Sequence, residues 1–459
     1  MSQKIGENNE RLREFVERPI GWLLWQYSLP SVVGMVVMSL YNIVDRIFIG
    51  HVVGPEAIAG LTVTFPVMNI ATAIGVLVGG GAAARVSIML GNDDHENALR
   101  VMGNALVLTL VNAIVYLTFF AIFMDDMLRA FGASDVTLPY AREFMTYLLP
   151  GLLLINVTFS FNNIMRASGF PRKAMVTMLI GAGLNIILAP TFIYVLRLGI
   201  KGAAIATDIS MFVSAVFVLS HFAMKKSTLR YQRGIYRPRW DIIYGILAIG
   251  AAPSIVNVAS CMINMIINNS LGRYGGDSAV AAAGIFTTYT AMIVSIILGI
   301  CMGMQPIIGY NYGARRIDRL KKTYLLAVGA STLICLIGWI GGMTVPRLIA
   351  RCFTVDANLI DVTGNALSLS MICFWVVGFQ IISTTLFQSI GKAGKSIFLG
   401  LTRQVLFLIP LLYIMQNYFG LDGIWLSFPS SDFCATVVTV ILVVTQFRSF
   451  KKQYDPERL

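Results

Sequence analysis

A few polar side chains interrupt long apolar stretches in the first half of this 459-residue chain. Asn42 and Asp45 lie three residues apart, so they share a helix face and can act together. Asn185, Thr207 and Asp208 lie in two further apolar stretches. Inside a membrane such groups are costly and usually functional, and their oxygens can hold a proton or a small cation. These five residues form the candidate ion site.

The composition determines the setting of these residues. Hydrophobic residues make up 56% of the chain, charged residues only 13%, and the mean hydropathy is +0.74. These values exclude a soluble globule and a disordered chain. The six cysteines are scattered, which excludes a disulfide framework, and all three histidines lie at the ends of apolar stretches. We therefore expect no cofactor and no metal beyond a possible Na+.

Long apolar runs, separated by Gly, Pro and charged residues, predict an all-α integral membrane protein with twelve transmembrane helices. The first six spans are 20–48, 57–84, 99–122, 139–164, 174–196 and 201–223. The second six spans are 242–270, 280–311, 323–346, 361–387, 396–416 and 421–447.

The chain repeats itself at an offset of about 222 residues. Arg166-Ala-Ser-Gly169 corresponds to Gln388-Ser-Ile-Gly391, and Gly81 corresponds to Gly303. An offset of six helices gives two six-helix lobes of parallel topology, the arrangement of a transporter that opens alternately to the two sides. The predicted divisions are an N-terminal segment (1–19), an N-lobe (20–224), a linker (225–241), a C-lobe (242–447) and a tail (448–459).

The distribution of basic residues predicts the orientation. Of the 35 Lys and Arg residues, 26 lie in segments on the side of the termini. Because cytoplasmic loops are enriched in Lys and Arg, both termini are expected in the cytoplasm. The net charge of +12 is then explained by topology and by attraction to membrane lipids, so no nucleic-acid partner is expected.

The two halves differ where the candidate ion site lies. Asp45 corresponds to Ile267, Asn185 to Phe407, and Thr207-Asp208 to Phe428-Pro429. From the rise per helical residue, Asp45 lies roughly 8 Å below the outer end of its helix, and Asn185 and Thr207 roughly 12 Å or more. We therefore expect these groups to meet in the outer half of the N-lobe.

Several motifs together resemble the multidrug and toxic compound extrusion (MATE) transporters, most closely their MepA-like bacterial branch, over essentially the whole chain. They are Asn42-Ile-Val-Asp45-Arg-Ile-Phe-Ile-Gly50, Gln305-Pro-Ile-Ile-Gly-Tyr-Asn-Tyr-Gly-Ala314, Arg166-Ala-Ser-Gly169, Phe387-Gln-Ser-Ile-Gly-Lys392 and Arg403-Gln404. The resemblance implies a multi-pass antiporter of the bacterial plasma (inner) membrane that exports xenobiotics, namely lipophilic and often cationic drugs or toxic cations, in exchange for H+ or Na+. We expect it to act as a monomer.

The resemblance also implies a coupling-ion site formed by Asp45, Asn185 and Thr207. The family pattern on the fifth helix is Asn-x-x-x-Asp-Pro, whereas this chain has Asn185-Ile-Ile-Leu-Ala189-Pro190. The expected second carboxylate is absent. Three alternatives follow: Asp45 couples alone, Asp208 supplies the missing charge, or the coupling is altered.

Polar residues on other spans are candidates for a substrate cavity between the lobes: Asn156, Asn163, Asn264, Gln305 and Arg403. The main rival function is a flippase for lipid-linked oligosaccharide or polysaccharide precursors, which needs several midplane cations, and the sequence offers only Arg403. An enzyme is not expected because no catalytic groups converge. A channel would explain the two-lobe repeat less well.

Overall fold

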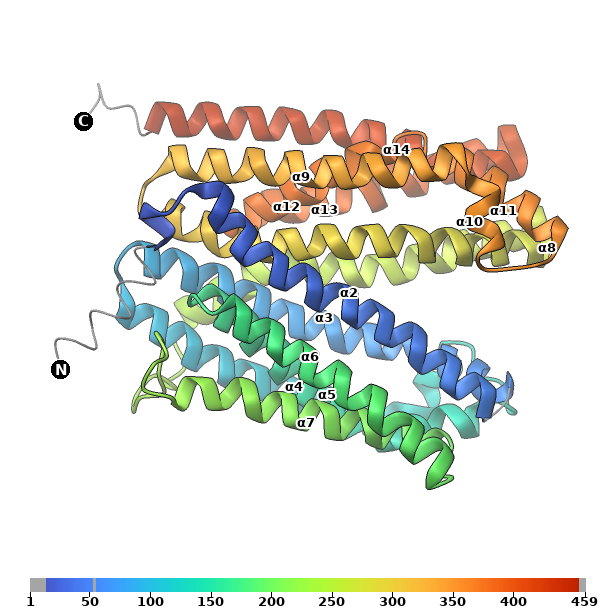
Figure 1. Ribbon diagram of the computed structural model, residues 1–459, viewed down its shortest axis with the longest axis horizontal. Coiled ribbons are helices and arrows are strands. Elements are labelled where there is room, and N and C mark those ends of the chain that lie inside the picture. Colours follow the sequence, from blue (N-terminus) through green and yellow to red (C-terminus); the bar gives the residue numbers. More distant parts are fainter. Residues whose placement is uncertain (1–13, 53–54, 454–459) are drawn as a thin grey trace.

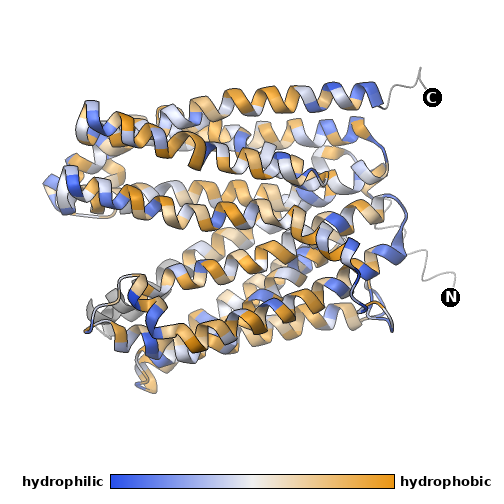
Figure 2. Cartoon of the chain, turned by 180° about the vertical axis from the view of Figure 1, so that it is seen from behind, coloured by the Kyte–Doolittle hydropathy of each residue, from blue (hydrophilic) through white to orange (hydrophobic). Residues whose placement is uncertain are grey.

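The computed structural model describes the backbone of residues 14–52 and 55–453, and the side chains in these ranges except those of 41–60 and 62. Every regular element in these ranges is a helix. Hydrophobic residues predominate along the middle of the bundle, and hydrophilic residues collect at its two ends (Figure 2). Helices suit this setting because they satisfy their own backbone hydrogen bonds where water is absent.

The N-lobe is built from six helical spans. Its elements are α2 (Ile20–Val52), α3 (Pro55–Gly91), α4 (His95–Ala130), α5 (Leu138–Ala167), α6 (Pro171–Pro190) continued by the π-helix η1 (Thr191–Val195), and α7 (Ile200–Ala223). Local sequence sets several helix starts. The side chain of Asp94 accepts a hydrogen bond from the Asn97 amide (3.1 Å), and prolines open α5 and α6.

The C-lobe contains the remaining elements. They are α8 (Trp240–Gly313), α9 (Ile317–Thr344), α10 (Pro346–Arg351), α11 (Ala357–Ser370), the 3-10 helix η2 (Phe374–Val376), α12 (Val377–Ser389), α13 (Ala393–Leu401), the π-helix η3 (Thr402–Leu408) and α14 (Ile409–Gln453).

Two of these helices are too long for one crossing. The 74 residues of α8 would extend about 110 Å if straight, against a hydrocarbon thickness of about 30 Å. α8 breaks at Gly276 (φ +65°) and α14 at Gly420 (φ +58°), in a backbone region that favours glycine. With each break counted as a turn between crossings, the described chain has the twelve predicted spans.

The tenth span departs from the prediction of one continuous helix over 361–387. α11 and the helical segment from Phe374 to Ser389 meet at 56° across a short break. Several side chains of this region hydrogen bond to the backbone four residues earlier, a pattern that bends helices. The span is therefore a bent pair.

Glycines bring the two lobes together at one end of the bundle. A Cβ on Gly81 of α3 would lie 1.9 Å from the carbonyl oxygen of Ile246, and one on Gly250 of α8 would lie 1.7 Å from that of Leu77. Gly91 and Gly313 make similar approaches across the lobes. α2 begins and α14 ends at this end (Figure 1). The lobes are therefore closed together at the end of the chain termini.

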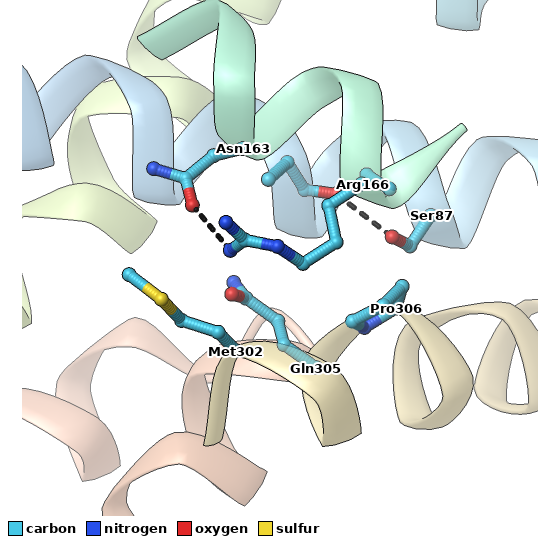
Figure 3. Close-up of a pocket in the computed structure, with 8 residues that line it drawn as sticks. Ser87, Asn163, Arg166, Met302, Gln305 and Pro306 are labelled. Atoms are coloured by element: carbon cyan, nitrogen blue, oxygen red, sulfur yellow. Dashed lines mark hydrogen bonds between the residues drawn. The ribbon is translucent and has the colours of Figure 1, made fainter. Parts of the chain in front are cut away.

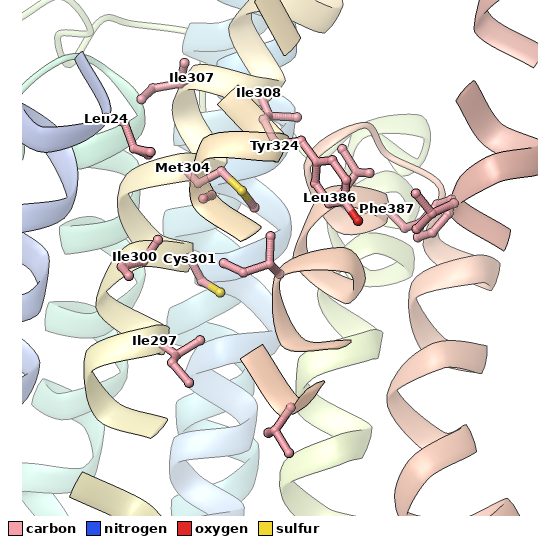
Figure 4. Packing of buried hydrophobic residues seen from close by; sticks show 14 of the residues in the cluster. Leu24, Ile297, Ile300, Cys301, Met304, Ile307, Ile308, Tyr324, Leu386 and Phe387 are labelled. Atoms are coloured by element: carbon pink, nitrogen blue, oxygen red, sulfur yellow. The ribbon is translucent and has the colours of Figure 1, made fainter. Parts of the chain in front are cut away.

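Apolar packing reinforces this contact. The first half of α2 contributes Leu23 and Leu24 to a buried cluster with the second half of α8, α9 and α12 (Figure 4). Met304 and Ile307, both fully buried, lie in this cluster. Because its residues come from both lobes, this cluster is part of the contact between them.

Candidate ion and substrate sites

Two of the residues assigned to the ion site meet inside the N-lobe. The Asn185 side chain on α6 donates from Nδ2 to Thr207 Oγ1 on α7 (3.0 Å), and the Thr207 hydroxyl donates to the Ala203 carbonyl (3.0 Å). Both residues are buried, at 1% and 6% exposure. Asn185 Oδ1 is buried without a hydrogen-bond partner among the described residues. The pair therefore holds an amide oxygen whose bonding capacity is unused.

Asn42 and Asp45 lie on α2, but their side chains fall outside those that the structure describes. Ala189, one turn from Asn185, is 1% exposed and belongs to an apolar cluster with residues of α3, α5 and α7. The position of the family's second carboxylate is therefore filled by apolar packing.

Asp208 lies on another side of α7 from the Asn185–Thr207 pair. Its Oδ1 is 1.9 Å from where a Cβ on Gly151 would lie, so it packs against α5. This oxygen is buried and has no hydrogen-bond partner in the described part of the chain. Adjacent helical residues point about 100° apart, which explains the separation from Thr207.

A pocket between the lobes brings together two of the substrate-cavity candidates (Figure 3). Asn163 on α5 and Gln305 on α8 line it from opposite sides. Arg166, which lies between them, is only 3% exposed. The other residues that line the pocket are Ala83, Ser87, Ala167, Met302 and Pro306.

Arg166 is held by neutral acceptors. Its Nη1 donates to Asn163 Oδ1 (3.0 Å) and its Nη2 to Asn162 Oδ1 (2.7 Å), while Nε is buried without a partner among the described residues. Gln305 donates to the Gly80 carbonyl (3.3 Å) across the lobes. No carboxylate among the described residues pairs with this guanidinium, and a buried charge without a counter-ion is costly.

The other cavity candidates lie apart from this pocket. Asn156 is 1% exposed and donates back to the Leu152 carbonyl of its own helix (2.9 Å), with its Oδ1 against Gly75 of α3. Asn264 is exposed on α8. Their assignment to a substrate cavity stays a prediction.

Arg403 forms an ion pair inside the C-lobe. Its Nε donates to Asp432 Oδ1 (2.6 Å), joining η3 to α14, and the two side chains are 30% and 3% exposed. Gln380 of α12 donates to the Asp432 backbone carbonyl (2.7 Å). Arg403 and Asp432 are therefore each other's counter-ions, and the assignment of Arg403 to a substrate cavity stays a prediction.

A comparison with known proteins agrees with this two-lobe architecture. The MatE family model matches residues 30–191 and again residues 253–414, together more than half of the chain. The chain therefore belongs to the MatE family. The two matches also agree with the repeat seen in the sequence. Family members are transporters, so this MatE protein is a multi-pass membrane transporter and not an enzyme.

Curated relatives of this MatE protein span nearly its full length. The multidrug export protein MepA of Staphylococcus aureus (strain MSSA476) is 26% identical over 444 residues, covering 96% of this chain and 97% of the relative. The protein of the same name from Staphylococcus haemolyticus is 26% identical over 439 residues, covering 95% and 96%. The expected likeness to the MepA-like branch is confirmed.

Solved structures of two transporters have the same fold. The outward-facing conformation of a multidrug resistance MATE family transporter of the MOP superfamily superposes with a TM-score of 0.90 at 27% identity, covering 96% of this chain and 98% of that one. A Pyrococcus furiosus MOP superfamily transporter, described by a reverse polarity of its binding pocket that suggests a different function, superposes with a TM-score of 0.90 at 26% identity, covering 95% and 98%.

Sequence reasoning missed Arg166 as a pocket residue. A signal was present: Asn162 and Asn163 precede Arg166 by four and three residues, and side chains at these spacings meet on one helix face. It was missed because Arg166 lies at the end of its span, where a basic residue is expected to be cytoplasmic.

Proposed function

We propose that this MatE protein is a secondary active multidrug efflux antiporter that exchanges lipophilic, often cationic compounds for H+ or Na+. Support comes from the MepA relatives, which are named multidrug export proteins, and from the two-lobe architecture. The protein would work as a monomer in the bacterial plasma membrane, in contact with its lipids and with both termini in the cytoplasm.

The observation that carries this proposal is the buried Asn185–Thr207 pair. A rotation of the Asn185 amide would present its unused Oδ1 toward the Thr207 hydroxyl, giving two neutral oxygens for a cation. Asp45 would supply the negative charge, with Asn42 beside it on the same face. A carboxylate at low dielectric also gains proton affinity, so the same site suits H+.

Rocking of the lobes would couple the ion to the substrate. The structure has the lobes in contact at the end of the termini, where glycines of α3 and α8 approach backbone carbonyls. An ion that binds more tightly to one arrangement and a substrate that binds more tightly to the other then share one conformational equilibrium. Asn163 and Gln305 would meet a substrate when this end opens.

Transport in vesicles tests the proposal. Proteoliposomes loaded with a fluorescent lipophilic cation are exposed to a pH gradient and, separately, to a Na+ gradient. We expect drug movement under one of them and its loss in Asp45→Asn, with the variant still folded in the membrane. Unimpaired movement in Asp45→Asn would remove Asp45 from the mechanism.

The flippase function remains the second candidate because of Arg166. An anionic lipid headgroup needs cations in the space between the lobes, and the inter-lobe pocket contains a guanidinium with no carboxylate partner among the described residues. The same vesicles with a fluorescent lipid-linked pyrophosphate distinguish the two functions. Movement of the lipid, and of no drug under either gradient, would favour the flippase.

A further inference from the structure

Two lysine side chains converge on one buried amide where α12 turns into α13. The Nζ atoms of Lys392 and Lys395 each donate to Gln446 Oε1 of α14 at 3.0 Å. Lys392 also lies over the ring of Phe450 (5.8 Å) and Lys395 over that of Phe387 (5.5 Å). Two ammonium groups are thus held within a few ångström of each other in fixed positions.

The described residues supply no compensating negative charge at this point, since neither lysine forms an ion pair with a carboxylate there. Burial, together with the neighbouring charge of Lys395, lowers the pKa of Lys392. Gln446 is fully buried, and its Nε2 has no hydrogen-bond partner in the described chain. Two like charges held on one neutral acceptor favour the binding of an anion beside them.

The backbone adds further donors here. α13 begins at Ala393, and its N-cap residue, Lys392, makes no side-chain capping bond. The first N–H groups of an α-helix have no intrahelical acceptor and carry a partial positive charge, which favours anions, phosphates above all. Gly394, in this first turn, is exposed and a Cβ there would meet nothing within 4 Å. An anion can therefore approach the helix start from outside.

The repeat provides an internal comparison. Lys395 corresponds to Lys173, whose Nζ lies 3.2 Å from His221 Nδ1 at the matching turn of the N-lobe. Lys392 corresponds to Phe170. The N-lobe turn carries its second cation, Arg172, at the position of Gly394, so the pair of ammonium groups on one buried amide is specific to the C-lobe.

We propose that Lys392, Lys395 and the first turn of α13 bind the phosphate group of an anionic membrane lipid. The turn joins two membrane spans, so it lies at the level of the lipid headgroups, at the end of the bundle where α14 ends (Figure 1). Both ammonium groups lie over aromatic rings and donate to the same oxygen of Gln446, which holds them in one place. The site does not depend on which compounds the protein transports.

Lipid titration of the purified full-length chain tests this site. The protein is placed in phosphatidylcholine nanodiscs with an increasing fraction of phosphatidylglycerol, and bound lipid and the unfolding midpoint are measured. The double variant Lys392→Gln/Lys395→Gln should bind phosphatidylglycerol on the order of thirtyfold more weakly and lose most of the lipid-dependent gain in midpoint. The double variant Lys392→Arg/Lys395→Arg should keep both the affinity for phosphatidylglycerol and the lipid-dependent gain in midpoint.

A matched control removes the same charge elsewhere. Lys321 and Lys322 are exposed at the start of α9, and Lys321→Gln/Lys322→Gln should bind the lipid as the wild type does. Equal losses in the two double variants would overturn the proposal, because the effect would then be general surface charge. Inorganic phosphate in detergent should give little stabilisation. If it reproduces the full effect of the lipid, the assignment to a lipid is wrong.

Discussion

At the scale of single residues, the Asn185–Thr207 contact is expected to matter more for ion-driven efflux than for the stability of the fold. Asn185 already has one unfilled buried oxygen, so its replacement by an apolar residue of similar size costs little folding free energy. We expect Asn185→Leu to change the free energy of unfolding by less than about 1 kcal/mol while reducing ion-driven efflux on the order of tenfold. Thermal unfolding and vesicle transport measure the two effects. A parallel fall in both would mean that Asn185 is only structural.

Ala189 tests the missing carboxylate. Ala189→Asp places an acid one turn from Asn185, next to the pair that the ion is proposed to bind. If Asp45 and the pair hold a cation, the added charge should tighten its binding and shift the Na+ or H+ dependence of efflux. An unchanged ion dependence in folded Ala189→Asp would show that position 189 takes no part in coupling.

Arg403 and Asp432 form a pair whose members depend on each other. Removal of one partner leaves a buried charge uncompensated, so Arg403→Met and Asp432→Asn should each lower stability by about 3–5 kcal/mol. The double variant should lose less than either single variant, and a double-mutant cycle by thermal unfolding measures the difference. Additive losses would show that the two charges act separately.

At the scale of elements, Asn104 hydrogen bonds to the backbone of the linker between the lobes. Its Nδ2 donates to the Ile235 (3.4 Å) and Arg237 (3.2 Å) carbonyls, and its Oδ1 accepts from the Arg239 amide (2.9 Å). Asn104→Leu should destabilise the protein by about 2–3 kcal/mol because it leaves several backbone groups without partners. The ion dependence of transport should stay unchanged. This variant therefore contrasts with Asn185→Leu, and an effect on ion dependence alone would contradict the structural role.

The elements themselves could largely be predicted from the sequence, because long apolar runs and the breaks between them are local signals. The turn between the seventh and eighth spans was predicted correctly around Gly276, where the backbone of α8 leaves the helical conformation. The bend between α11 and α12 could not be predicted because no proline or charge marks it, and the π-helix η3 could not be predicted because Arg403 within it does not by itself indicate a π-helix. They depend on packing against neighbouring helices.

The sites show the same limit. The sequence correctly predicted that Asn185 and Thr207 meet, because the rise per helical residue gives the depth of each residue in the membrane. It did not pair Arg403 with Asp432, which requires knowing how each helix is rotated about its axis. Rotation also decides that Asp208 faces α5, away from the residue before it.

At the scale of the whole molecule, the glycine contacts between α3 and α8 determine whether the lobes can close. Gly250→Val adds a side chain where even a Cβ would lie 1.7 Å from the Leu77 carbonyl oxygen. Since backbone cannot yield as a side-chain tip can, the lobes must move apart at the end of the termini. Gly284→Val, on the same helix with nothing within 4 Å of its Cβ, is the matched control.

Hydrogen exchange and transport together report this closure. In Gly250→Val, the amides of α3 around Gly81 and of α8 around Ile246 should lose protection, because their solvent shielding depends on the lobe contact. Efflux should fall sharply, since one of two alternating arrangements is disfavoured. Gly284→Val should keep both protection and transport. If Gly250→Val kept both protection and transport as well, the lobe contact at these glycines would not be the closed state of the transport cycle.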